Sequence, residues 1–510
     1  MTGCASLPSK VERPVSTALS GPVQTRLGQL VEARAAGAGT RNDSGFTLIG
    51  NAELAFTSRM ALIKAAQATL DMQYYAIFAD DTTERMFGAL REAAKRGVRI
   101  RILLDDFNTS GKNAQVLTLA FETNIEVRLF NPLPGGRESM VLRILSNLKE
   151  VARIQRRMHN KIFIADNAVA ITGGRNLGEN YFGQSKGTNF VDIDILAAGR
   201  IARELSRSFD QYWNNPLAYP VQSLMTVQET SMLRSTTAVP PGDMPAQPAA
   251  AVVDAASALA DSIDLNRLTW TWAPFALLVD HPSKIAADAD DVAEAQETAV
   301  DGLLQLMSQA KSDLLIVSPY FVPGKVMMDQ FTKLRQRGVR LRVLTNSLAS
   351  NDAPAAHAGY ARYREALLAM GIEMYEMRAE QKGTLTNFGS GTGSAGGSKG
   401  GSRASLHAKV VVVDGQILVV GSMNLDLRSK LQNSEVAIAI RNRALSQEAI
   451  RMIEPALTSG AYRVELVGGG LMWRAPHGSD LKDSTTEPDA SLALKLLLKL
   501  FGPFAPEEML

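Results

Sequence analysis

Residues 158–176 read MHNKIFIADNAVAITGGRN, and residues 406–424 read LHAKVVVVDGQILVVGSMN. In each stretch a histidine is followed by a lysine two positions later and by an aspartate seven positions later. Two small residues and an asparagine then follow at matched distances. The apolar runs predict a buried strand, a tight turn at the aspartate and a second strand. The chain therefore carries the same hairpin twice.

The segments around the two hairpins also correspond. Residues 91–106 (REAAKRGVRIRILLDD) match residues 333–347 (KLRQRGVRLRVLTNS), each typical of a helix end, a glycine stop and a buried strand. Residues 70–80 match 314–324, and residues 124–130 match 371–377. All pairs occur in the same order, roughly 240–250 residues apart, which indicates an internal duplication. Strands alternate with helices early in each half, which favours parallel βαβ pairing and an α/β fold.

This duplication divides the chain into five parts. Between the halves, residues 239–262 are rich in Pro and Ala and are typical of a linker or exposed loop. Residues 389–402 are rich in Gly and Ser and predict a surface loop before the second hairpin. We expect an N-terminal tether at 1–22, a first domain at 23–225, a linker or insert at 226–300, a second domain at 301–468 and an extension with an amphipathic helix at 469–510.

Composition narrows the class of protein. Of 510 residues, 45% are apolar and 21% are charged, as in an ordinary globular enzyme. The net charge is only +2, so no bulk field attracts nucleic acid, and we expect no nucleic-acid partner. One cysteine excludes a disulfide framework and Cys-rich metal sites. No apolar run reaches the ~18 residues of a transmembrane helix.

The single cysteine has a position that suggests lipidation. Met1-Thr2-Gly3-Cys4-Ala5 resembles the end of a bacterial lipoprotein signal, although only three residues precede Cys4. Residues 5–20 are rich in Ser and Pro and predict a flexible tether. A lipidated Cys4 would anchor the protein to a membrane without spanning it, whereas the alternative is a thiol without a role.

The spacing within the hairpins has a chemical meaning. On a strand, His159 and Lys161 point to the same face, as do His407 and Lys409. Residues Ile162, Ile164, Val410 and Val412 fall on the opposite, buried face. The motif aspartates Asp166 and Asp414 also fall opposite the His/Lys pairs, at the turns, so this geometry favours a structural role for them.

Two such His/Lys pairs suit phosphorus chemistry. One imidazole can attack a phosphodiester to form a phosphohistidine, while the other acts as acid and then as base. The lysines, with Asn176, Ser422 and Asn424, would bind the phosphoryl oxygens. Each histidine also needs an acceptor for its second ring nitrogen. The candidates are Asp192 and Glu435, which follow the histidine of their own half by 33 and 28 residues.

This pattern resembles the phospholipase D superfamily over most of residues 50–465. The resemblance implies two α/β/α sandwich halves, a pseudo-twofold active site with one motif per half, and no metal or other cofactor. It implies that His159 is the nucleophile and His407 the general acid, with Lys161, Asp166, Lys409 and Asp414 completing the catalytic set. The resemblance is strongest to bacterial cardiolipin synthases of the C type, in the stretches RRMHNK (156–161), GGRNLGENYFG (173–183), LTNSLASND (344–352), HAGYARYR (357–364) and ASLHAK (404–409).

The implied activity is transfer of a phosphatidyl group to make cardiolipin. The substrates would be phosphatidylglycerol and a second phospholipid, either phosphatidylethanolamine or phosphatidylglycerol, reacting through a phosphatidyl-histidine. A phospholipase D-type hydrolase or nuclease is the alternative, and a membrane-tethered scaffold with a dead site is a third reading. Because both motifs lie in one chain, we expect the monomer to be functional.

Two segments predict contact with a membrane surface. Residues 137–161 combine basic residues with apolar ones at helical spacing, next to His159. Such a helix would lie on an anionic membrane, or else pack on the sheet with solvated charges. The tail 491–504 (SLALKLLLKLFGPF) favours interfacial contact in the same way. We therefore expect a peripheral or lipid-anchored protein of a bacterial membrane. At the ends of corresponding strands, Asp105-Asp106 and Thr345-Asn346 would line a head-group pocket or form turns.

Overall fold

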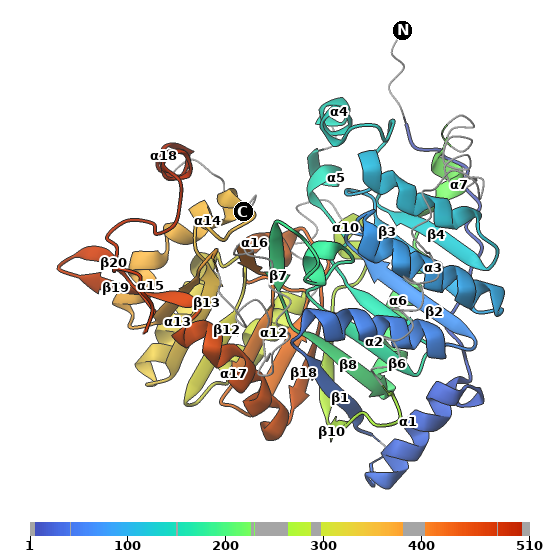
Figure 1. The fold of residues 1–510 in the computed structure, drawn as a ribbon, viewed down its shortest axis with the longest axis horizontal. Helices are drawn as coiled ribbons and strands as arrows, with labels where there is room; N and C mark the ends of the chain where they lie inside the picture. The colour runs from blue at the N-terminus through green and yellow to red at the C-terminus, as the bar shows by residue number, and fades with distance from the viewer. Residues whose placement is uncertain are drawn as a thin grey trace.

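The structure is a computed structural model. It describes residues 6–40, 42–148, 151–225, 229, 264–286, 297–380, 403–476 and 478–501. Two similar halves lie side by side, the N-terminal half in blue to green and the C-terminal half in yellow to red (Figure 1). Cys4 and the stretches 239–262 and 389–402 lie outside the described residues, so the expectations for them stay predictions.

The first half is built on a nine-stranded sheet. In spatial order the strands are β10 (Thr271–Ala273), β1 (Ser44–Ile49), β8 (Asp194–Gly199), β6 (Val169–Gly173), β5 (Ile162–Ala165), β2 (Thr69–Tyr74), β3 (Arg99–Asp105), β4 (Ile125–Phe130) and β9 (Ala218–Pro220). Strands β2, β3 and β4 are parallel, and β5 with β6 forms the predicted antiparallel hairpin.

The second half repeats this sheet. Its order is β11 (Phe275–Val279), β18 (Val436–Arg441), β17 (Ile417–Gly421), β16 (Val410–Val413), β12 (Asp313–Val317), β13 (Arg340–Asn346), β14 (Glu373–Met377), β19 (Ala461–Val467) and β20 (Gly470–Arg474). Strands β12, β13 and β14 are parallel, and β16 with β17 is the second hairpin. A two-stranded parallel sheet joins the halves, formed by β7 (Thr188–Val191) and β15 (Arg403–Leu406).

Helices cover both sheets. In the first half they are α1 (Arg26–Gly37), α2 (Ala52–Ala65), α3 (Asp81–Lys95), α4 (Met140–Ser146), α5 (Val151–Gln155), α6 (Arg200–Trp213) and α7 (Val221–Leu224), with 3-10 turns at Pro22–Gln24, Gly111–Phe121 and Glu179–Tyr181. In the second half they are α10 (Ser283–Ala286), α12 (Ala299–Ser308), α13 (Gly324–Gln336), α14 (Pro354–Ala361), α15 (Arg364–Ala369), α16 (Leu427–Leu431), α17 (Arg443–Thr458) and α18 (Leu492–Phe501). The glycine stops predicted after α3 and α13 are present, since Gly97 and Gly338 have φ of 92° and 80°.

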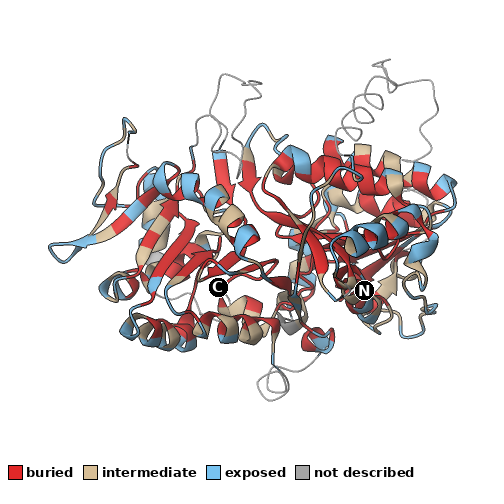
Figure 2. Cartoon of the chain, turned by 90° about the horizontal axis from the view of Figure 1, so that it is seen from below, coloured by how far each residue is buried: buried red, intermediate tan, exposed pale blue. Residues whose placement is uncertain are grey.

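The two halves share one core. Ile162, Ile164, Val410 and Val412, the apolar residues opposite the His/Lys pairs, pack in the same cluster. Helices α6 and α17 contribute to this cluster, and α6 also packs on β11 of the other half. Buried residues are continuous from one half into the other (Figure 2). The predicted α/β/α sandwich is confirmed for both halves. The two sandwiches pack against each other through the cluster to which α6 and α17 contribute.

The structure adds detail to three of the predicted parts. The region 226–300, expected as a linker or insert, contributes β10 to the first sheet and β11 to the second. The C-terminal extension begins after β20 rather than at 469, since β19 and β20 pair as a hairpin. The N-terminal segment is not a free tether throughout: Arg128 donates to Pro14 O at 2.6 Å, and Ala18 N donates to Asp210 at 2.8 Å.

Candidate active site

Each catalytic-motif histidine is held at the seam between the halves. His159 N donates to Ser434 O at 2.9 Å, and Ser434 N donates to Arg157 O at 3.0 Å. On the other side of the seam, His407 N donates to Val191 O at 2.8 Å. The segment before each histidine therefore pairs with the segment before the candidate carboxylate of the other half.

The carboxyl ends of β3 and β13 fix the same two segments. Asp105 accepts a hydrogen bond from Met158 N at 2.8 Å, and Asn346 Oδ1 accepts one from Leu406 N at 2.8 Å. Met158 and Leu406 immediately precede the two histidines. The strand-end residues thus anchor the catalytic segments rather than presenting open side chains to a head group.

The carboxylates orient the histidines across the seam. Nδ1 of His159 lies 3.0 Å from Glu435 Oε2, and Nδ1 of His407 lies 2.8 Å from Asp192 Oδ2. The sequence distances had paired each histidine with the carboxylate of its own half, and that pairing is wrong. A carboxylate on Nδ1 fixes the tautomer that leaves Nε2 without a proton and able to act as nucleophile or base. Neither half contains a complete histidine site by itself.

The position after the first motif glycine is a serine in the second half and a glycine in the first, and this matches the difference in length between the glutamate and aspartate that orient the histidines. Ser422 Oγ donates to Glu435 Oε2 at 2.5 Å, and Ser429 Oγ donates to Oε1 at 2.9 Å. The counterpart of Ser422 is Gly174, where a Cβ would lie 2.5 Å from an Asp192 carboxylate oxygen and 2.8 Å from His407 O. The shorter aspartate therefore lies against a glycine, whereas the longer glutamate is held by serines. Ser422 therefore contacts the carboxylate that orients His159, and its role in substrate binding stays a prediction.

The two motif asparagines are placed differently. Asn176 accepts from Ala76 N at 3.2 Å and donates to Tyr181 Oη at 3.0 Å, so it also braces the site. Asn424 is 4% exposed, and its Oδ1 has no hydrogen-bond partner among the described residues. Of the predicted substrate-binding residues, Asn424 has the most freedom to bind a ligand.

Both motif lysines are buried beside the histidines. Lys161 Nζ donates to His159 O at 2.7 Å, and Lys409 Nζ donates to His407 O at 2.6 Å. Burial lowers the pKa of Lys161 well below its usual value, although the Glu435 carboxylate opposes this. Burial likewise lowers the pKa of Lys409 to about 8, against the opposing effect of Asp192. Both ammonium groups are poorly solvated, which strengthens their attraction for a phosphate anion.

The imidazoles are neutral at neutral pH. Burial lowers the pKa of His159 well below 6.5, and the charges of Lys161, Lys409 and Arg428 add to that effect. Burial and the same two lysines also lower the pKa of His407. Because each lysine acts on both histidines, the four side chains form one electrostatic unit. Burial also raises the pKa of Glu435 to about 7, and raises that of Asp192.

The motif aspartates lie at the far ends of the hairpins. Asp166 accepts from the backbone N–H groups of 67–69, at 2.8 Å from Ala68 N, and Asp414 accepts from those of 311–313, at 2.8 Å from Ser312 N. Both have positive φ, 52° and 53°, as the predicted primed turns require. Through these hydrogen bonds the aspartates tie the turns to β2 and β12. Four or more strand residues separate each aspartate from its histidine, so both aspartates lie outside the reacting centre.

Aromatic residues that we did not predict complete the walls. The Tyr75 ring meets His159 edge-on at 5.2 Å between centroids, and the Tyr181 ring meets His407 in the same way at 5.2 Å. Phe190 lies 5.1 Å from His407. Tyr75 follows a buried strand and Tyr181 follows the GGRN turn, but nothing in their spacing marks them as neighbours of histidines. Among the described residues no group of three or more His, Cys, Asp or Glu side chains is placed to hold a metal ion.

Comparisons with known proteins show the family of the chain. The family described as "Cardiolipin synthase, PLD-like domain" matches residues 60–213 and 303–456, one match in each half. Cardiolipin synthase C of Escherichia coli is 35% identical over 88% of this chain and 92% of its own length. Cardiolipin synthase B of Salmonella typhi is 22% identical over 80% of this chain and 79% of its own.

A solved structure has the same fold. Phosphatidylserine synthase of Haemophilus influenzae aligns with a TM-score of 0.58 at 14% identity, covering 94% of this chain and all of that one. The chain belongs to the phospholipase D-like cardiolipin synthase family. In the part of the chain that the structure describes, no helix is long and apolar enough to cross a membrane.

Proposed function

We propose that this protein is a phosphatidyltransferase that makes cardiolipin from phosphatidylglycerol and a second phospholipid. The observation that carries the proposal is the crossed pair of histidines, each held by a carboxylate of the other half and flanked by buried lysines. The similarity to cardiolipin synthase C of E. coli supports the choice of reaction within the family.

In the first step Nε2 of His159 attacks the phosphorus of the donor lipid. The P–N bond forms as the bond from phosphorus to the head-group oxygen breaks, and His407 gives a proton to the departing alcohol. The product is phosphatidyl-His159. Burial and the charges of Lys409 and Lys161 lower the pKa of His407, so it is neutral at neutral pH when no anion lies beside it. An anionic phosphate beside it raises its pKa, which lets it carry the proton when substrate is bound.

In the second step a phosphatidylglycerol hydroxyl replaces His159. His407 takes the proton of this hydroxyl, the new P–O bond forms, and the P–N bond breaks to release neutral His159. Lys161, Lys409 and Asn424 bind the phosphoryl oxygens in both steps. The donor is phosphatidylethanolamine, with loss of ethanolamine, or phosphatidylglycerol, with loss of glycerol. Attack by water would release phosphatidic acid instead.

Product analysis tests the proposal. Purified full-length protein is incubated with phosphatidylglycerol, alone and with phosphatidylethanolamine, in mixed micelles, and the lipids are separated by mass. We expect cardiolipin, and we expect the His159→Ala and His407→Ala variants to lose at least ~10³-fold in rate.

The lipid mixture that supports turnover identifies the donor. Phosphatidic acid as the sole product would make the protein a hydrolase and overturn the proposal. Cardiolipin formation that survives both histidine substitutions would overturn the mechanism.

A further inference from the structure

Helix α4 exposes apolar side chains and buries an arginine, which is the reverse of an ordinary surface helix. In α4, Val141, Leu142 and Leu145 are 66%, 66% and 57% exposed, and Leu148, two residues past the end of the helix, is 56% exposed, whereas Arg143 is 1% exposed. The four apolar residues follow a helical repeat and share one face. The sequence predicts that the basic residues of 137–161 face an anionic membrane or solvent, and this is wrong for α4, whose Arg143 is buried. An apolar face on the outside with an arginine inside calls for a partner.

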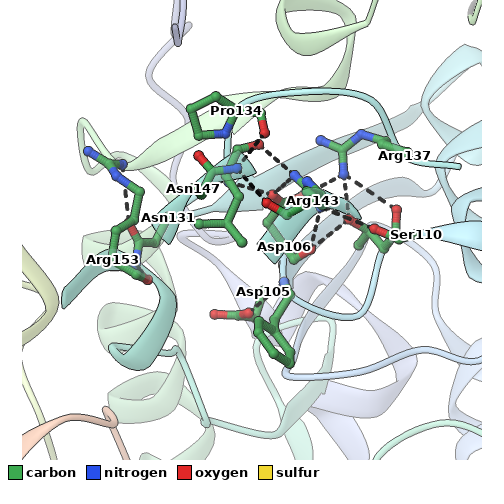
Figure 3. Close-up of polar contacts among 12 residues, drawn as sticks. Asp105, Asp106, Ser110, Asn131, Pro134, Arg137, Arg143, Asn147 and Arg153 are labelled. Carbon is green, nitrogen blue, oxygen red and sulfur yellow. Dashed lines mark hydrogen bonds and ion pairs between the residues drawn. The ribbon is translucent and has the colours of Figure 1, made fainter. Parts of the chain in front are cut away.

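Buried ion pairs fix α4 in this orientation. Arg137 donates to Asp106 Oδ1 at 2.6 Å, and Arg143 pairs with the other oxygen of the same carboxylate. Arg143 also donates to Leu133 O at 2.6 Å, and Asn147 donates to Pro134 O at 3.0 Å. Figure 3 shows Arg137 and Arg143 converging on Asp106, with Asn147 beside Pro134. Rotating α4 to bury its leucines would leave the buried Asp106 carboxylate without Arg143. The fold therefore fixes the exposed apolar face of α4.

A second apolar helix lies at the same end of the molecule. In α18, Leu492 is 75% and Leu496 is 51% exposed. Figure 1 places α4 and α18 along the same edge, one in each half. Asp106, which holds α4, follows Asp105 at the end of β3, and α18 packs on α14, which follows β13. Since the ends of β3 and β13 also anchor the histidine segments, both helices flank the edge of the sheets where the chemistry takes place.

A lipid surface fits this pair of helices better than a protein does. Three exposed aliphatic side chains on a seven-residue helix, with Leu148 just past its end, fall short of the ~800 Å² per partner that a standard protein interface buries. The two apolar helices are also separate projections, which a bilayer can accept one by one. Helix α18 contains Lys495 and Lys499 and no acidic residue, which suits anionic head groups. We propose that α4 and α18 insert into the surface of an anionic bilayer and hold the active site over the lipid head groups.

Vesicle binding tests this surface. The inference rests on the proposed function only in that the substrates are bilayer lipids, so binding is measured apart from turnover. Full-length protein is floated with vesicles of phosphatidylglycerol and phosphatidylcholine. We expect the wild type to float, and the Leu142→Ser/Leu145→Ser variant to lose roughly tenfold or more in vesicle affinity, because burial of each leucine contributes on that order. The matched control is Val326→Ser, which removes a side chain 62% exposed on α13.

Other outcomes separate the possible failures. We expect His159→Ala to bind vesicles as the wild type does. If the wild type makes no cardiolipin but its vesicle binding still depends on α4, only the proposed function is refuted. Equal vesicle binding by the wild type and the α4 variant would overturn the docking surface. A wild-type dimer that the α4 variant dissociates would also overturn it, by assigning the face to a second copy of the chain.

Discussion

At the scale of single residues, the crossed carboxylates are the strongest feature of the site. Glu435 and Asp192 each hold the Nδ1 of a histidine in the other half. A carboxylate in this position maintains the useful tautomer and stabilises the imidazolium that forms during proton transfer. The two carboxylates therefore hold two histidines with different proposed roles in one reaction, Glu435 the nucleophile and Asp192 the acid and base.

Substituting Glu435 by its amide tests its part in the first step. We expect Glu435→Gln to slow the release of the donor head group by roughly 10²–10⁴-fold, because His159 is no longer held as a nucleophile. Rapid-quench measurement of ethanolamine or glycerol release in the first turnover checks this. A normal first turnover in Glu435→Gln would contradict the pairing of Glu435 with His159.

The pH dependence follows from Lys409. Burial lowers its pKa to about 8, so its charge is present below that pH and is lost above it. We expect kcat/KM to fall above about pH 8 as the phosphoryl oxygens lose this cation. We also expect Lys409→Arg to move the alkaline limb to higher pH, since a guanidinium stays charged. Lys325→Arg, at an exposed position, is the control, and a profile that is level from pH 7 to 9.5 in the wild type would contradict the role of Lys409.

At the scale of elements, the hairpins carry two separate functions. Their histidine ends build the site, and their turns, at Asp166 and Asp414, tie the sheet together. The sequence predicted this division, because strand alternation places each aspartate on the face opposite the histidine. The crossed pairing was not predictable, since it depends on how two sheets pack and not on any spacing within a half.

The turn aspartates should affect stability more than chemistry. In Asp166→Asn one carboxylate oxygen becomes an amino group facing backbone N–H donors, which costs about 1–3 kcal/mol of unfolding free energy. Denaturant unfolding measures this cost, and Asp329→Asn at an exposed position is the control. We expect the turnover of the folded fraction to change by less than roughly tenfold, because Asp166 touches no reacting group. A loss comparable to that of His159→Ala, with unchanged stability, would make Asp166 catalytic.

Gly174 tests the fit of Asp192. A methyl group there would lie 2.5 Å from the Asp192 carboxylate and would displace it from His407. We expect Gly174→Ala to lower kcat by about 10–100-fold with a smaller change in KM, since orientation rather than binding is lost. Gly187→Ala, where the nearest atom would lie at 3.7 Å, is the matched control. Full activity in Gly174→Ala would show that Asp192 has room to move.

At the scale of the whole molecule, one chain holds a complete site. The duplicated hairpins, the α/β class and the two motif histidines that meet between the halves were all predictable, because each depends on local patterns such as HNKIFIAD and HAKVVVVD. The orientation of α4 was not predictable. An arginine in an amphipathic helix is typical of a surface position, and the partner that buries Arg143 is Asp106, 37 positions away in the sequence. Similarly, β10 and β11 are short strands whose pairing is decided only by the edges they join.

A mixing experiment tests the single-chain site. We expect that combining the His159→Ala and His407→Ala proteins will not restore activity, since every site takes both histidines from one chain. Recovery of a quarter or more of the wild-type rate would mean that the halves of two chains assemble the site. The measurement is cardiolipin formation by equimolar mixtures over a range of protein concentrations.

The most direct test of the account is the location of the covalent intermediate. Wild-type protein is mixed with isotopically labelled phosphatidylglycerol, quenched in alkali to preserve phosphohistidine, digested and sequenced by tandem mass spectrometry. The account predicts a phosphatidyl group on the peptide that contains His159 and its absence in His159→Ala. Cardiolipin formed with no adduct on either histidine would contradict it.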